Sequence, residues 1–81
     1  MVHATRPPDQ RLQLGAALRA LRQAKGMTAT QAAASLLVSQ PKISSMETGR
    51  RRISPRDVRD LCKIYGVEDQ RTVEALIRMA G

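Results

Sequence analysis

The sequence predicts a small all-α domain of five helices, and three observations lead to this prediction. Apolar residues recur at spacings of three and four, as on one face of a helix, in separate stretches along the chain. Residues that cap helix N-termini precede these stretches, and glycines follow several of them. No stretch alternates regularly between apolar and polar residues, so we expect no β-sheet.

The length and composition are those of one domain with a small core. The chain has 81 residues, of which 42% are hydrophobic, but it holds one Tyr and no Phe or Trp. Aliphatic side chains and alanines must therefore fill the core, which suits small helices that cross closely. We expect residues 1–9 to form a flexible N-terminal arm and residues 10–81 to form the domain.

The first helix is expected to run from a cap at Asp9 to about Lys25, with Gly26 ending it. Thr28 caps a second helix, and Gln31 completes a capping-box pattern with it. The residues expected to face the core from these two helices are Leu14, Ala17, Leu18, Leu21, Ala32, Ala33 and Leu36.

Ser39 is the expected cap of a third helix over about 39–48, with Pro41 in its first turn. Ser54, Pro55 and Asp57 predict the start of a fourth helix, as cap, first-turn proline and first-turn acid. A last helix is expected from about Asp69 to Ala80. The inward residues of these three helices are Ile43, Met46, Val58, Leu61, Cys62, Tyr65, Val73, Leu76 and Ile77.

Positive charge is concentrated in the first two thirds of the chain. The net charge is +7, but residues 1–56 carry ten Lys or Arg against two acids, and residues 57–81 carry four against five. A one-sided basic domain is typical of proteins that bind nucleic acid. The alternative is an ordinary solvated basic surface.

Several other classes of function find no support in the sequence. Cys62 is the only cysteine, and His3 is the only histidine, so we expect no disulfide, metal or cofactor. No apolar run approaches the roughly 20 residues of a membrane span, so no membrane partner is expected, and a reducing cytoplasm fits best. An enzyme is a poor fit because no paired carboxylates or activated nucleophile can be found.

The stretch from Thr28 to Glu47, TATQAAASLLVSQPKISSME, fits two helices that meet at a sharp angle. Such a pair needs apolar contacts and one small residue at the crossing, here Ala33. The stretch resembles the helix-turn-helix of the Xre/Cro-type repressor family. The resemblance covers roughly Leu14 to Val67, and GRRRISPRDVRDLCKIYGV is similar to actinobacterial members. It implies a lambda-repressor-like domain, sequence-specific binding of double-stranded DNA by a bacterial transcriptional regulator, and a third helix in the major groove.

The sequence departs from the family pattern at two positions. Leu37 stands where the family usually has a glycine in the turn, and a left-handed backbone there would cost about 1 kcal/mol. Either this turn takes another conformation or the domain tolerates the strain. Ala29 stands where such repressors often carry a glutamine that binds a phosphate, so that contact is not expected.

Five residues of the third helix are candidates for contact with bases: Gln40, Pro41, Lys42, Ser44 and Ser45. Glutamine can bond adenine through two hydrogen bonds, and a proline ring can contact a thymine methyl. The alternative for these residues is an ordinary solvated helix surface. Related domains often have arginine where Ser45 stands, so we expect modest base readout and a larger role for DNA shape.

The candidates for contact with DNA phosphates lie at helix starts and behind the third helix: Thr28, Ser39, Arg50, Arg51, Arg52 and Arg56. The alternative for the arginines is a solvated turn. The resemblance also implies an internal ion pair between Arg22 and Glu47, which would orient the third helix if it is buried.

The expected partners are double-stranded DNA and a second copy of the chain on a pseudo-palindromic site. The segment with Val73, Leu76, Ile77 and Met79 is a candidate dimer or partner surface, unless these residues only pack on the core. Related proteins often continue into a longer C-terminal region, so regulation by such a region or by a protein partner is also expected. The alternative function is an antitoxin-like or adaptor module that binds protein, with the helix-turn-helix as scaffold or autoregulatory element.

Overall fold

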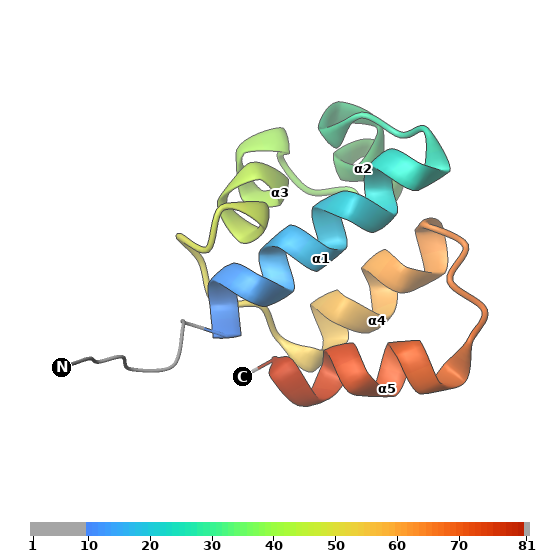
Figure 1. Cartoon of the computed structure of the whole chain (residues 1–81). Helices are drawn as coiled ribbons and strands as arrows, with labels where there is room; N and C mark the ends of the chain where they lie inside the picture. Colours follow the sequence, from blue (N-terminus) through green and yellow to red (C-terminus); the bar gives the residue numbers. More distant parts are fainter. Residues whose placement is uncertain (1–9, 81) are drawn as a thin grey trace, which may run out of the picture.

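The computed structural model describes residues 10–80, which form five α-helices and no strand (Figure 1). The predicted all-α fold is therefore confirmed. The helices are α1 (Gln10–Lys25), α2 (Ala29–Leu36), α3 (Gln40–Glu47), α4 (Pro55–Ile64) and α5 (Gln70–Met79). The expected N-terminal arm, its Asp9 cap and Gly81 lie outside the described residues.

Helices α2 and α4 begin directly after the capping residues that the sequence predicts. The Thr28 hydroxyl accepts a hydrogen bond from the Gln31 N–H at 3.0 Å, and the Gln31 side chain accepts one from the Thr28 N–H at 2.8 Å. Ser54 and Asp57 form a second reciprocal box at the start of α4. Because each box satisfies N–H groups that have no partner within the helix, it fixes where that helix begins.

The turn between α2 and α3 settles the question raised by Leu37. Its backbone is left-handed, with φ 59° and ψ 41°, and 93% of the residue is exposed. The Leu37 N–H donates to Ala34 O and the Val38 N–H to Ala33 O, which closes α2. The domain thus tolerates the strained conformation, and the leucine side chain gains no burial in return.

Helix α1 lies at the centre of the molecule (Figure 1). It packs against α3 on one side and against α4 and α5 on the other, while α2 contacts both α3 and α4. The buried hydrophobic residues come from every helix: Leu14, Leu18, Ala32, Ala33, Ile43, Met46, Ile53, Val58, Leu61, Cys62, Tyr65, Val73 and Leu76. Ile53 is the addition to the predicted core, since it lies between two helices where no periodic pattern marks it.

The apolar residues of α5 are mostly used inside the domain. Val73 and Leu76 are 8% exposed, and Ile77 and Met79 are partly buried against the same core. These four residues therefore mainly pack on the core of their own domain, which was the alternative to a partner surface. In the part of the chain that the structure describes, no helix has the length and apolar character needed to cross a membrane.

Candidate nucleic-acid interface

Helix α3 has one face in the core and one face at the surface. Ile43 and Met46 are each 1% exposed, so they fix the inner face. Gln40 and Pro41 are exposed at the first turn, and Ser44 and Ser45 are partly exposed further along. The structure thus leaves all five candidate base-contacting residues, Lys42 included, at least partly exposed on one short helix.

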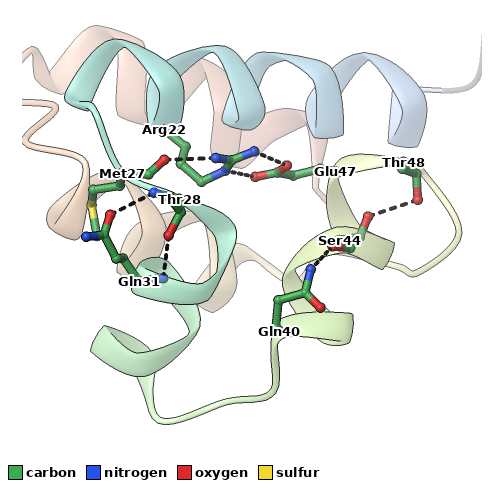
Figure 2. A network of polar contacts seen from close by, with 8 residues as sticks. All are labelled: Arg22, Met27, Thr28, Gln31, Gln40, Ser44, Glu47 and Thr48. Atoms are coloured by element: carbon green, nitrogen blue, oxygen red, sulfur yellow. Dashed lines mark hydrogen bonds and ion pairs between the residues drawn. The ribbon is translucent and has the colours of Figure 1, made fainter.

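Gln40 and Ser44 are joined by a hydrogen bond across one helical turn. The Gln40 Nε2 donates to the Ser44 Oγ at 2.5 Å, and the Thr48 hydroxyl donates to the Ser44 carbonyl oxygen at 2.9 Å (Figure 2). An amide nitrogen carries two hydrogens, so Gln40 keeps one N–H and its carbonyl oxygen for another partner. These are the two groups that a bidentate contact with adenine requires.

Lys42 lies apart from these residues. Its Nζ is 4.0 Å from the Asp57 Oδ1 of α4, and the lysine is partly buried. It lines a groove of about 270 Å³ together with Leu36, Val38, Met46, Arg56, Asp57 and Asp60. Its ammonium group therefore faces α4, a placement that spacing within one helix cannot reveal.

Arg22 and Glu47 form a two-point ion pair between α1 and the end of α3. The Arg22 Nε is 2.7 Å from the Glu47 Oε2, and the Arg22 Nη2 donates to the Glu47 Oε1 at 2.9 Å (Figure 2). The Arg22 Nη1 also donates to the Met27 carbonyl oxygen at 2.8 Å. The hydrogen bond to Glu47 raises the pKa of Arg22, against the opposing effect of burial. One guanidinium thus joins three segments behind α3.

Gly15 allows α1 and α3 to approach closely, and sequence reasoning missed it. A Cβ atom at this position would lie 2.7 Å from the Glu47 carbonyl oxygen and would also clash with the Met46 carbonyl oxygen. Only hydrogen fits there, because the backbone of α1 packs directly against the last turn of α3. Glycine is unfavourable inside a helix, so its presence at position 15 is the signal that could have indicated a close contact there.

Cys62 of α4 and Tyr65, which caps the end of that helix, are both buried in the core, as predicted. Burial raises the pKa of the Cys62 thiol. Burial, and next the charge of Glu47, raise the pKa of Tyr65 to about 12. Within residues 10–80 the buried Tyr65 hydroxyl has no hydrogen-bond partner.

The segment of residues 50–56, here called the arginine segment, follows α3 directly. Arg50, Arg51, Arg52 and Arg56 are all exposed in it. Ile53, which is 2% exposed, inserts between them into the core and fixes the segment against the domain. Four exposed arginines therefore lie between the end of α3 and the first turn of α4.

The two hydroxyl candidates for phosphate contact stand at helix starts. Thr28 and Ser39 are exposed, and each oxygen accepts a hydrogen bond from a backbone N–H three residues on. Acceptance leaves the O–H free to donate, so both can still bind an anion. The backbone N–H groups at these helix starts add to the local positive potential.

Comparisons with known proteins agree with this geometry. A family model described as a helix-turn-helix domain matches residues 13–76. Among solved structures, the chain is similar to the clp gene regulator ClgR from C. glutamicum. The TM-score is 0.76 and the identity 32%, and the match covers 90% of each chain. No match was found among curated proteins.

Proposed function

The chain belongs to the helix-turn-helix domain family, and from this premise we propose that it binds specific sites in double-stranded DNA as a bacterial transcriptional regulator of the Xre/Cro type. The observation that carries the proposal is the junction of α3 and the arginine segment. There, a helix with exposed neutral polar side chains is followed in the chain by four exposed arginines. The similarity of the chain to a gene regulator, over 90% of each chain, supports the same function and does not favour a protein-binding adaptor.

In this proposal the exposed side of α3 enters the major groove. Gln40 is the strongest base-reading candidate because it is exposed and keeps a free donor and acceptor. Pro41, Ser44 and Ser45 supply apolar contacts and hydroxyl groups. Lys42 contributes at the edge of the interface, since its ammonium lies toward Asp57.

The arginine segment supplies affinity for the DNA backbone. Arg50, Arg51, Arg52 and Arg56 neutralise phosphates, while Thr28 and Ser39 donate to them from helix starts. These contacts carry no base information, but they set the register of α3 on the duplex. A regulator of this kind acts at the nucleoid, in the cytoplasm.

We also propose that two copies bind together on DNA. In residues 10–80 the exposed large hydrophobic residues are Leu12 and Leu37, at 51% and 93% exposure, so the domain offers little apolar area to a stable partner. A pseudo-palindromic site would supply the missing affinity by holding two copies one helical turn apart. The dimer is therefore expected on DNA and weak in its absence.

The test is selection of bound duplexes from a random DNA pool at near-physiological salt. The expected result is a motif of two inverted half-sites spaced by about 10 base pairs. If no motif emerges and binding disappears steeply as salt rises, the domain supplies electrostatic affinity alone, and the proposed sequence-specific function of this chain is wrong.

A further inference from the structure

Lys42 of α3 and Asp57 of α4 form an ion pair in a groove of about 270 Å³. The Lys42 Nζ is 4.0 Å from the Asp57 Oδ1, and the two side chains are 29% and 26% exposed. Leu36, Val38 and Met46 line the same groove, and the aliphatic stem of a lysine can cover apolar surface of this kind. The ammonium group of Lys42 is therefore held towards α4 by its stem and by its charge.

Asp57 is itself fixed in place by the capping box of α4. Its Oδ2 accepts a hydrogen bond from the Ser54 N–H at 3.1 Å, and its own N–H donates to the Ser54 Oγ at 3.0 Å. The other oxygen of the same carboxylate, Oδ1, faces Lys42. Because the box orients this carboxylate, Asp57 offers Lys42 a negative charge at a fixed position.

The restraint on Lys42 distinguishes it from the cations of the arginine segment, which are exposed. An exposed cation can bind the phosphates of any duplex, because the charge of the DNA backbone does not depend on its sequence. A cation beside a carboxylate attracts a phosphate less strongly, since the two opposite charges of the pair largely cancel at a distance. Lys42 is therefore expected to add little to the binding of random DNA.

We propose that Asp57 is a specificity-determining residue, which restrains Lys42 and so lowers the affinity for random DNA more than the affinity for the preferred site. This inference rests on the proposed function. On the preferred site, base contacts fix where α3 lies, and the phosphate contacts are set by that position. On random DNA the domain can shift until an additional free cation meets a phosphate, so releasing Lys42 would strengthen this binding in particular.

The first experiment compares Asp57→Asn with the wild-type chain on the selected site and on random DNA. Asparagine keeps an oxygen that can accept from the Ser54 N–H, but it has no charge to hold Lys42. We expect the Kd for random DNA to fall about three- to fivefold and its salt slope to steepen by about one, with a change of less than about twofold on the selected site. An unchanged ratio of the two affinities would overturn the proposal.

Asp60→Asn is the matched control, because Asp60 lines the same groove and the variant loses the same charge while the pair of Lys42 and Asp57 stays intact. We expect both affinities to rise by a similar small factor. A gain on random DNA as selective as that of Asp57→Asn would mean that net charge, and not the pair, sets the ratio, and the proposal would fail.

Lys42→Gln tests whether Asp57 acts through the lysine. In this background, Asp57→Asn should leave the ratio of the two affinities unchanged, because no ammonium group remains to be released. If the ratio still falls, Asp57 acts on DNA without Lys42, and its assignment as the restraint is wrong.

Urea denaturation of the two single variants and the double variant measures the pair without DNA. We expect a coupling of about two- to fivefold in the unfolding constant, whereas additive effects would show that the pair does not form and would overturn the proposal. A chain that shows the coupling but prefers no duplex would refute the proposed function and this inference with it. A chain that prefers its site, and keeps the same preference in Asp57→Asn, would refute this inference alone.

Discussion

Helix α3 and the arginine segment are neighbours in the chain, but they differ in how they are held and in what they present. The inner side of α3 is fixed by Ile43, Met46 and the ion pair of Glu47, while its outer side carries short neutral groups. The arginine segment has one buried residue, Ile53, and four exposed guanidinium groups. Helix α3 thus holds its outer groups in fixed positions, and the arginine segment supplies the positive charge.

This difference has a consequence for how each element contributes to DNA binding. Guanidinium groups attract phosphates over several ångströms, so small errors in their position cost little. A hydrogen bond to a base edge depends on distance and angle, so it needs a helix held firmly from behind. Changes behind α3 should therefore affect stability and selectivity, and changes to the four exposed arginines should affect affinity alone.

The largest effect is expected from Glu47→Gln, which leaves Arg22 without its carboxylate. The side chains are 12% and 8% exposed, so we expect the free energy of unfolding to fall by about 2–3 kcal/mol. Urea denaturation measures it. Glu74→Gln, on the exposed side of α5, makes the same chemical change and should cost less than about 0.5 kcal/mol. Similar losses in both variants would contradict a special role for the ion pair.

The next effect is expected from Gly15→Ala, because the added methyl would push against the carbonyl oxygens of Met46 and Glu47. Overpacking of this kind costs about 1–3 kcal/mol, even though alanine favours a helix. Selective DNA binding should fall with stability, as α3 is displaced. Gly26→Ala is the control, since nothing lies within 4 Å there and the cost comes only from its φ of +79°. An unchanged melting curve for Gly15→Ala would mean that α1 and α3 separate easily.

Arg51→Gln tests the arginine segment. We expect affinity for the selected site and for random DNA to fall by a similar factor, and the salt slope to decrease by about one. Stability should not change, because Arg51 is exposed. Arg59→Gln, an exposed arginine of α4 outside the segment, is the matched control. If both slopes stay unchanged, Arg51 contacts no phosphate.

Gln40→Ala tests the outer side of α3 and should have a smaller effect. We expect a loss of about 1 kcal/mol on the selected site and almost none on random DNA. The lower end of the usual range is expected because Ser44 already uses one Gln40 N–H. Comparing both duplexes in one binding assay gives the answer, and equal losses would remove Gln40 from base reading.

The smallest effect concerns the turn that leads into α3. Leu37→Gly removes a side chain that is 93% exposed and relieves a left-handed backbone. We expect the free energy of unfolding to rise by up to about 1 kcal/mol, with DNA selectivity unchanged. Thermal melting measures the gain. A loss of stability would show that the leucine makes contacts in solution that the folded domain does not account for.

Helix positions could be predicted from the sequence because caps are local. Thr28, Ser39 and Ser54 each act within three residues, so the spacing alone identifies them. The close approach at Gly15 could not be predicted in this way, because the clashing atoms belong to residues 46 and 47 of another helix. The burial of Ile53 escaped notice for a similar reason, since a single apolar residue between helices has no period.

In the candidate site, too, local features could be predicted from the sequence and contacts between distant segments could not. Exposure of Gln40 and of the four arginines follows from helix period and charge, which the sequence contains. The position of Lys42 beside Asp57 depends on how α4 packs against α3. Such juxtapositions are properties of the fold.

The one-sided attachment of α3 also bears on how such a domain can evolve. All the contacts that hold this helix come from its inner face and its ends, and Gln40 and Pro41 take no part in the core. Since we propose that Gln40 and Pro41 contact bases, substitutions at these two positions are expected to change the preferred DNA sequence and to leave the core intact. A lineage can therefore acquire new target genes by a few outward substitutions, while the inner face stays under selection for structure.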